Sequence, residues 1–405
     1  MIVLVKITEV KPILCQGGIK NWTFCKITTD EGIIGWGDGT EWATPKGVAS
    51  HISDFGAMII GENPCNTEKI WQLCWRSAYV GGKDVSAALC AIETALLDIK
   101  GKIYDIPAVE LLGGQIWNKV RLYFDYVDSY RRDESLEGVV KECERAKGLG
   151  FTAVKAHPVD LPPRGKVAGW MKGSLDWPEI SRTASLVSVK NTAKKIETIR
   201  ETLGDEVDIC VDVNNRLDLP SAMRLAKALE PYHLLFLEDA ICQHEDAAPS
   251  YKRLADSTST PIGTGENLYT IWEFRSYLAI GALDVLLPDV CHTGISQARK
   301  IAALAEAYHL PVCPHNPNSP LSTIISANMV SSIPNFVALE YYEPSREPPW
   351  RDKVMEPSIG SLVKDGYLEL PKGPGWGVEM DEGEIAKHPY EETWLSRKFV
   401  SGKTT

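Results

Sequence analysis

The 405-residue sequence predicts an α/β fold in which an N-terminal α+β capping domain precedes a (β/α)8-type barrel. After Gly114, eight short apolar runs alternate with amphipathic stretches over about 220–250 residues, the length expected for such a barrel. Before Gly114, β-prone segments come first and helical segments follow, which is typical of a separate α+β unit. The predicted domains are 1–118 (capping), 119–360 (barrel) and 361–405 (a C-terminal tail that returns to the capping domain).

The capping domain is predicted from its turn signals and apolar spacing. Residues 24–28 are β-prone, and the turn signal Asp30-Glu31-Gly32 separates them from a second apolar segment at 33–37. Between 66 and 112, apolar residues recur at helical spacing until Gly113-Gly114 ends the pattern. We therefore expect a small sheet followed by helices.

Eight strands are predicted for the barrel, at 120–126, 152–157, 208–214, 234–239, 261–266, 285–289, 311–315 and 336–340. Helices are expected between them, for example at 221–230 and 297–307. Residues 158–190 form a long insert rich in Pro and Gly after the second strand, and a loop of this length is usually functional or mobile. The tail from about residue 360 is expected to be loop-like.

The composition excludes several classes of protein. A net charge of −11 and a pI of about 5.4 argue against a nucleic-acid partner or an anionic membrane surface, because both require a basic face. No stretch approaches the ~18 consecutive apolar residues of a membrane helix, and the first apolar run is too short for a signal peptide. Ten cysteines without a Cys-x-x-Cys pair indicate reduced thiols in a cytoplasmic protein. We also expect a homo-oligomer.

Ionisable side chains end nearly every predicted strand of the barrel: Lys155, His157, Asp212, Glu238, Glu266, Asp289, His315 and Glu340. From Asp212 onward, neighbouring members are 23 to 28 residues apart, which is one strand–helix unit each time. They therefore share one rim, the C-terminal face where barrel enzymes place their active sites. A single acid at a strand end is most often a helix cap, but capping does not predict strong acids or bases on seven of eight strands.

The carboxylates Asp212, Glu238 and Glu266 are the candidate metal ligands. Three carboxylates on one rim repel one another unless a cation joins them. Oxygen ligands without Cys or His favour Mg²⁺ over zinc or copper. Such an ion would stabilise the enolate formed when a C–H bond beside a substrate carboxylate is deprotonated.

Two further pairs are candidates for proton transfer. Asp289 and His315 end adjacent strands, and a carboxylate beside an imidazole fixes its tautomer and raises its basicity. Lys155 and His157 lie two apart on one strand, so both side chains point inward together. They could act on the substrate from its opposite face.

These residues carry a resemblance to a known family. The motifs are residues 91–102 and Leu111-Leu112-Gly113-Gly114 in the capping domain, then 211–214, 237–239, 264–267, Pro288-Asp289, Pro314-His315, Leu339-Glu340 and 375–379. Together they resemble the enolase superfamily, in its mandelate racemase subgroup, and most of all its acid-sugar dehydratases of the galactonate-dehydratase type. The resemblance covers almost the whole chain.

The resemblance implies roles for individual residues. It assigns Asp212, Glu238 and Glu266 to Mg²⁺ and Asp289–His315 to an acid/base dyad. Glu340 would hydrogen-bond the enolate oxygen, and Lys155 matches the first lysine of a Lys-x-Lys motif. Asn214 would contact the substrate. From the capping domain, the loop near residues 15–21 would close over the substrate, and Arg76 and Tyr79 are candidate contacts.

The sequence departs from the family pattern at two positions. The second lysine of Lys-x-Lys is His157 here, which weakens the case for a lysine-based racemase. Residue 214 is Asn, where galactonate and mannonate dehydratases resemble each other in carrying His, which weakens the case for those two substrates.

Three functions are compatible with the sequence. The first is a Mg²⁺-dependent dehydratase of an aldonate or aldarate, which removes the α-proton and the β-hydroxyl to give a 2-keto-3-deoxy sugar acid. The second is a racemase, epimerase or cycloisomerase of a hydroxy acid that shares the first half of this reaction. The third is a catalytically idle sensor, which would be expected to have lost a metal ligand or the dyad.

Overall fold

The computed structural model describes residues 5–79, 81–125, 127, 135–158, 182–342 and 347–392. The first unit is an antiparallel sheet of β1 (Ile7–Gln16), β2 (Asn21–Thr29) and β3 (Ile34–Asp38). Four helices follow it: α1 (Pro45–Ile59), α2 (Thr67–Ser77), α3 (Lys83–Tyr104) and α4 (Ala108–Leu111). The predicted strand at 24–28 and the helical region at 66–112 are confirmed, whereas α1 lies in a segment without a prediction.

Glycines on β3 and directly after it explain why α3 can lie directly on the sheet. A Cβ atom added at Gly35, Gly37 or Gly39 would lie only 1.9 to 2.4 Å from the backbone oxygens of Ala95, Ala91 and Ala87, respectively. The three glycines are two residues apart on the strand and therefore share one face. Since the alanines are four apart on the helix, the two rows match. The other side of α3 contacts α10, so the helix is buried over most of its length.

The barrel strands run in chain order. They are β4 (Val120–Phe124), β5 (Ala153–Ala156), β6 (Asp208–Asp212), β7 (Phe236–Glu238), β8 (Ile262–Thr264), β9 (Val285–Leu286) and β10 (Leu339–Tyr341). Neighbours pair in parallel from β4 to β9, and β10 pairs with β4. The seventh predicted strand, 311–315, is reduced to single bridges from Val312 to Leu286 and Phe336. These bridges connect β9 to the segment that leads to β10, so the predicted eight-membered barrel is confirmed.

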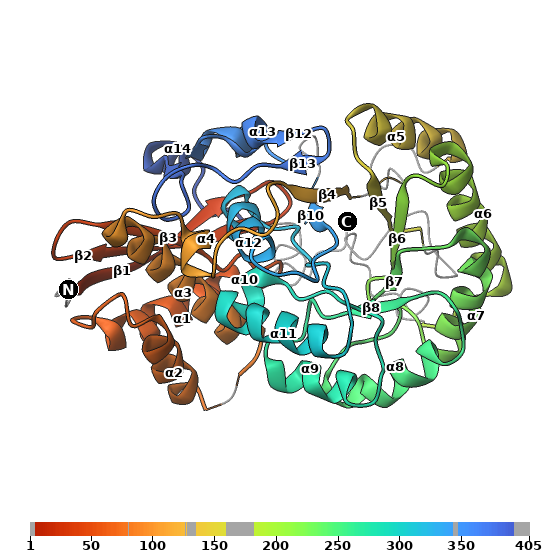
Figure 1. The fold of residues 1–405 in the computed structure, drawn as a ribbon, viewed down its shortest axis with the longest axis horizontal. Coiled ribbons are helices and arrows are strands. Elements are labelled where there is room, and N and C mark those ends of the chain that lie inside the picture. Colours follow the sequence, from red (N-terminus) through yellow and green to blue (C-terminus); the bar gives the residue numbers. More distant parts are fainter. Residues whose placement is uncertain are drawn as a thin grey trace.

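Helices cover the outside of the barrel (Figure 1). They are α5 (Leu136–Gly148), α6 (Leu186–Leu203), α7 (Leu219–Leu229), α8 (Ala248–Ala255), α9 (Ile271–Leu278), α11 (Ile295–Ala307) and α12 (Pro320–Ser331). The short helix α10 (Val290–Thr293) instead contacts α3 of the capping domain. Helix α6 begins at Leu186 and not after residue 190, because Ser185 caps its first turn by accepting from the Ser188 N–H. Residues 159–181 of the predicted insert lie outside the described residues.

The C-terminal segment is not loop-like as predicted but carries short elements. They are β11 (Met355–Glu356), α13 (Ile359–Leu362), β12 (Val363–Lys364), β13 (Tyr367–Leu368), β14 (Glu379–Met380) and α14 (Glu382–Lys387). β13 pairs with β4 at the barrel, whereas Lys26 of the capping sheet forms an ion pair with Glu382 of α14. Figure 1 shows the blue C-terminal elements beside the red capping sheet. The tail thus joins the two units.

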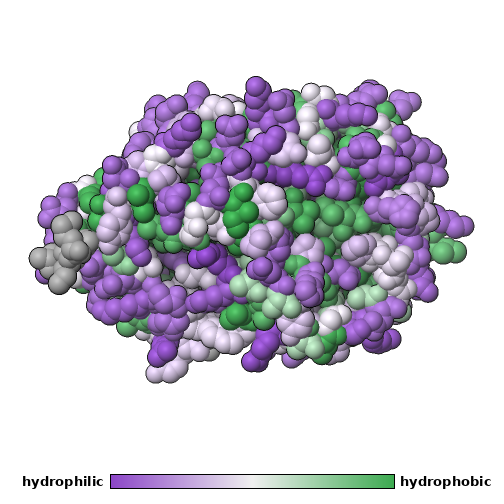
Figure 2. Space-filling model, viewed as in Figure 1, coloured by the Kyte–Doolittle hydropathy of each residue, from purple (hydrophilic) through white to green (hydrophobic). Residues whose placement is uncertain are grey.

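Polar side chains cover most of the face seen in Figure 2, with scattered apolar patches. Within the described ranges, no helix has the length and apolar character needed to span a bilayer. All ten cysteines are free thiols and eight of them are buried, as expected for reduced cysteines.

Candidate active site

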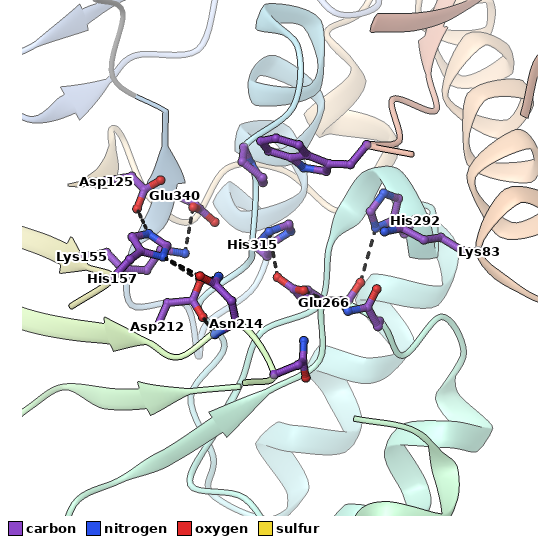
Figure 3. Close-up of a pocket in the computed structure, with 14 residues that line it drawn as sticks. Lys83, Asp125, Lys155, His157, Asp212, Asn214, Glu266, His292, His315 and Glu340 are labelled. Carbon is purple, nitrogen blue, oxygen red and sulfur yellow. Dashed lines mark hydrogen bonds and ion pairs between the residues drawn. The ribbon is translucent and has the colours of Figure 1, made fainter. Parts of the chain in front are cut away.

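A cavity of about 270 Å³ lies at the carboxyl ends of the barrel strands, beneath the capping domain (Figure 3). Barrel and capping side chains both line it: Trp42, Lys83, Asp125, Lys155, His157, Asp212, Asn214, Asn215, Glu266, Asn267, His292, His315, Pro317 and Glu340. The structure therefore brings most of the sequence-predicted site residues to one cavity.

The three candidate metal ligands follow consecutive strands. Asp212 is the last residue of β6 and is paired in register with Glu238, the last residue of β7. Glu266 lies two residues beyond the end of β8. Glu238 is 1% exposed and is not among the described residues that line the cavity.

Each of these carboxylates is paired with one basic side chain. Asp212 Oδ2 lies 3.2 Å from His157 Nδ1, Glu238 Oε2 lies 3.3 Å from Lys155 Nζ, and Glu266 Oε2 lies 3.0 Å from His315 Nε2. Burial favours the neutral acids, but the paired bases oppose it. As a result the pKa of Asp212 lies well below its usual range, and that of Glu266 is lowered too. For Glu238 burial dominates and raises the pKa to about 8.

The carboxylate set fits a hard divalent cation, although it is neutralised by bases here. No three His, Cys, Asp or Glu side chains within the described residues already converge as a metal site. The three basic partners explain this, because each carboxylate points toward its own base. Glu238 Oε1 is buried without a hydrogen-bond partner in the described structure, so one oxygen of the set is available to a cation. Oxygen-only ligands suit Mg²⁺.

Asp289 and His315 form the predicted dyad. Asp289 Oδ2 lies 2.7 Å from His315 Nδ1 and also accepts from Asn318 Nδ2 at 2.9 Å. Asp289 Oδ1 accepts from the Cys291 N–H and so caps α10, which fixes the orientation of the carboxylate. Burial lowers the pKa of His315, but the neighbouring acids, Glu266 foremost, hold this pKa well above its ordinary value. Asp289 thus holds the His315 ring with Nε2 toward Glu266.

Lys155 and His157 both line the cavity from the end of β5, as their spacing predicted. Lys155 Nζ lies 2.8 Å from Glu340 Oε1 and bridges it to Glu238. Glu340 also accepts from the Asn316 backbone N–H at 2.9 Å. His157 Nε2 lies 2.8 Å from Asp125 Oδ1, a partner that the sequence analysis did not identify.

Asn214 holds the side chain of Asp212. Its backbone N–H and its side-chain amide donate to the two Asp212 oxygens at 2.6 and 2.5 Å. Asn214 has a φ of 49°, a left-handed conformation that asparagine tolerates better than most residues. The turn this creates keeps Asn214 beside the carboxylate and in the cavity lining.

The Gln243 side chain hydrogen-bonds the loop that carries Glu266. Its Oε1 accepts from the backbone N–H groups of Gly265 and Asn267, both at 3.2 Å, and its amide donates to Asp239. Burial raises the pKa of Asp239 well above its ordinary value, and the nearby acids add to this. The network fixes the backbone on both sides of Glu266.

Two family models match the chain. A model of the mandelate racemase/muconate lactonizing enzyme N-terminal domain matches residues 13–113, and an enolase C-terminal domain-like model matches residues 138–384. The second match alone covers more than half of the chain. This chain belongs to the mandelate racemase/muconate lactonizing enzyme family of the enolase superfamily.

Curated relatives of this family member include two dehydratases. A D-xylonate dehydratase of Haloferax volcanii is 32% identical over 393 residues, which is 95% of this chain and 89% of the relative. A D-mannonate dehydratase of Caulobacter vibrioides is 31% identical over 405 residues, 97% of each chain.

Solved structures of the family share the whole fold. An enolase-superfamily member from Salmonella Typhimurium has a TM-score of 0.86 and 28% identity, covering 95% of this chain and 99% of its own. A Burkholderia xenovorans protein, provisionally described as an L-alanine-DL-glutamate epimerase and bound to magnesium and fumarate, has a TM-score of 0.88 and 28% identity, covering 98% and 100%. The resemblance inferred from the sequence is thereby confirmed.

The capping domain of this family member contributes different residues from those predicted. Arg76 is exposed and bonds Gln72, and Tyr79 is 95% exposed; neither is among the described residues that line the cavity. Trp42 and Lys83 line it instead. Lys83 begins α3 and pairs with Glu41 at 2.8 Å, so the capping domain supplies a charged pair to the site.

Asp125 and His292 were also missed. Asp125 directly follows β4, so the strand-end rule that found its counterparts applied to it as well. His292 lies on the short helix α10, with its Nδ1 3.5 Å from Asp289 Oδ2 and its Nε2 3.2 Å from the Thr40 carbonyl oxygen. Its role depends on contact with the capping domain, which no local sequence pattern predicts.

Proposed function

We propose that this protein is a Mg²⁺-dependent dehydratase of an acid sugar, an aldonate or aldarate, and so a carbon–oxygen lyase. The observation that carries the proposal is the row of three carboxylates on consecutive strands, flanked by an imidazole at each side. Two relatives that cover almost the whole chain are dehydratases of D-xylonate and D-mannonate, which supports the same chemistry. The product would be a 2-keto-3-deoxy sugar acid.

Asp212, Glu238 and Glu266 would hold the Mg²⁺ ion. When bound, the ion supplies Lewis-acid stabilisation of the charge that develops on the substrate carboxylate. The neighbour with bound magnesium and fumarate supports a cation and a carboxylate ligand in this fold. In this role the cation would replace His157, Lys155 and His315 as the partner of each carboxylate.

His315 would transfer a proton at its Nε2 atom. Asp289 holds Nδ1, so Nε2 is the nitrogen that faces Glu266 and the cavity. His315 could protonate the leaving hydroxyl, or both remove the α-proton and protonate the hydroxyl in a syn elimination. Lys155 and Glu340, which are 2.8 Å apart, would hydrogen-bond the enolate oxygen.

A screen of acid sugars tests this proposal. Purified protein is incubated with Mg²⁺ and a panel of aldonates and aldarates, and 2-keto acids are assayed. We expect turnover of at least one member, abolished in the His315→Asn variant. The absence of turnover for every aldonate and aldarate would contradict the proposal.

A second candidate function is racemisation or epimerisation of a hydroxy acid. The imidazoles of His157 and His315 at two sides of the cavity favour it, since one could remove the α-proton and the other return it (Figure 3). Incorporation of solvent deuterium at the α-carbon without loss of water would favour this function over dehydration.

A further inference from the structure

The cavity contains two carboxylate–imidazole pairs of the same design. His315 has Asp289 on one ring nitrogen at 2.7 Å and Glu266 on the other at 3.0 Å. His157 has Asp125 on one ring nitrogen at 2.8 Å and Asp212 on the other at 3.2 Å. Each imidazole thus connects an outer aspartate to one of the three proposed metal ligands.

The two pairs lie at opposite ends of the row of metal-ligand strands. Asp125 and His157 follow β4 and β5, on one side of β6–β8. Asp289 and His315 follow β9 and the bridged segment at Val312, on the other side. A substrate carboxylate held in the middle would therefore have one imidazole at each flank.

Asp125 caps no helix in the part of the chain that the structure describes. Asp289 accepts from the Cys291 N–H at the start of α10, so part of its role is structural. Asp125 directly follows β4, and the next helix in the described chain, α5, begins at residue 136 with Ser135 as its cap. Asp125 is 1% exposed and lines the cavity together with His157. Burying a carboxylate is costly unless a partner stabilises it, and His157 is such a partner.

The geometry points to Asp125 as a positioning residue that holds the proton of His157 on Nε2 and makes Asp125–His157 a second proton-exchange dyad. This inference rests on the proposed function and deepens it. With Nε2–H donated to Asp125, Nδ1 is the nitrogen that faces Asp212 and Asn214, where a bound substrate would lie. A carboxylate that fixes a histidine tautomer in this way is known to matter for proton transfer.

With two dyads, one imidazole can accept a proton and the other can donate one during the elimination. The α-carbon–hydrogen bond breaks and its proton goes to one imidazole nitrogen, while its electrons form the enolate. The β-carbon–oxygen bond then breaks, and the hydroxyl leaves as water with a proton from the other imidazole. The resulting enol tautomerises to the 2-keto acid, and the imidazoles return to their starting states by exchange with solvent.

The test compares Asp125→Asn and Asp125→Glu with the wild-type protein. An asparagine amide can donate to Nε2, and this would move the ring proton to Nδ1. In ¹⁵N NMR spectra of the Mg²⁺-loaded protein, with the His157 signals assigned from His157→Asn, we expect Asp125→Asn to change the tautomer and Asp125→Glu to preserve it. Dehydration should fall about 10²–10⁴-fold in Asp125→Asn, the range of a lost acid–base contribution, and recover in part in Asp125→Glu.

Measuring the Mg²⁺ affinity distinguishes a loss of His157 positioning from a general disturbance of the site. Because Asp125 is not among the proposed ligands, the Kd for Mg²⁺ should change less than about threefold in Asp125→Asn, well below the effect of losing an outer partner of a ligand. Unchanged His157 signals, or wild-type turnover, would overturn the inference. If the wild-type protein dehydrates no acid sugar, the proposed function fails while the NMR comparison still decides the role of Asp125.

Discussion

Single side chains in this site depend on one another for charge balance. Lys155 is 1% exposed and lies between Glu238 and Glu340, which would otherwise be adjacent buried carboxylates. Neighbouring acids raise its pKa well above the ordinary value despite burial, which lowers it. Breaking such a pair by removing one partner leaves an uncompensated buried charge and costs about 3–5 kcal/mol. The site therefore cannot be understood one residue at a time.

The position of Glu266 depends on Gln243, and this gives a prediction. Gln243→Met removes the oxygen that accepts from the N–H groups of Gly265 and Asn267. We expect the Kd for Mg²⁺, measured by isothermal titration calorimetry, to rise about 10–100-fold, as for other lost outer contacts of metal ligands.

Tyr251→Phe is the matched control for Gln243→Met. The Tyr251 hydroxyl contacts the Ile241 carbonyl and Thr264 in the same network but does not contact the backbone of residues 265–267. Its loss should lower stability by about 1 kcal/mol and leave the Mg²⁺ affinity unchanged. Equal effects of the two variants on the Mg²⁺ affinity would show that Gln243 does not specifically position Glu266.

Whole elements are joined by buried polar contacts made by α3. At one end, Asp98 accepts from the backbone N–H of Trp36 in β3 and from that of Trp376 in the C-terminal segment, both at 3.0 Å. Near its middle, Glu93 Oε1 accepts from the Ser296 N–H at the start of α11 at 3.0 Å. The helix thus connects the capping sheet, the tail and the barrel.

Removal of the Asp98 carboxylate should loosen the tail. Asp98→Ala leaves the Trp36 and Trp376 N–H groups without their acceptor and removes the ion-pair partner of Lys102, which keeps only the Ile34 carbonyl oxygen. We expect a loss of about 3–5 kcal/mol in the free energy of unfolding, measured by urea denaturation. Asp105→Asn, at the left-handed residue that ends α3, should cost less than about 1 kcal/mol because asparagine tolerates that conformation; a similar loss in both variants would contradict the role of Asp98.

The buried Glu93 predicts a pH-dependent stability. Burial raises its pKa from 4.5 to about 7. Between these values the unfolded chain has released the proton that the folded protein keeps, so stability falls as pH rises from about 5 to about 7 and then levels off. Glu93→Gln lacks this effect and should gain up to about 3 kcal/mol over the wild type at pH 8. Thermal melts of both proteins at pH 5 and pH 8 test this; an equal difference in Tm at both values would contradict it.

At the scale of the whole molecule, the site lies between the capping domain and the barrel. Trp42 and Lys83 come from the first unit, and the carboxylates come from the second. Helix α3 and the C-terminal segment join these units through buried contacts, so occupation of the site should stabilise the entire protein. Binding to the folded state alone increases stability by mass action.

Mg²⁺ should therefore raise the Tm of the full chain. At a concentration 100 times its Kd, the expected gain is about 2.7 kcal/mol, reversed by EDTA. Glu266→Gln should abolish the gain, whereas Glu68→Gln, which alters only surface contacts with Lys300 and Gln72, should retain it. An equal Mg²⁺-dependent shift in Glu266→Gln would show that the ion binds elsewhere.

Much of this protein is determined by local sequence. The alternation of apolar runs predicted the barrel, and the acids at the strand ends predicted one rim, because parallel strands deliver their carboxyl ends to the same edge. Asp212, Glu238, Glu266, Asp289 and His315 could be named from this regularity alone. Asp125 obeys the same rule and was within reach of the sequence.

Only the tertiary structure decided which capping-domain residues lie opposite those strand ends. Arg76 and Tyr79 were chosen from the capping domain, yet Trp42 and Lys83 line the cavity, because the contacts of α3 with α10 and of β3 with α12 set how that domain lies on the barrel. The pairing of each proposed metal ligand with its own base is likewise a matter of distance in space. Spacing along the chain determines which residues lie on the same rim of the barrel. Only the packing of separate elements determines which charged side chains form pairs.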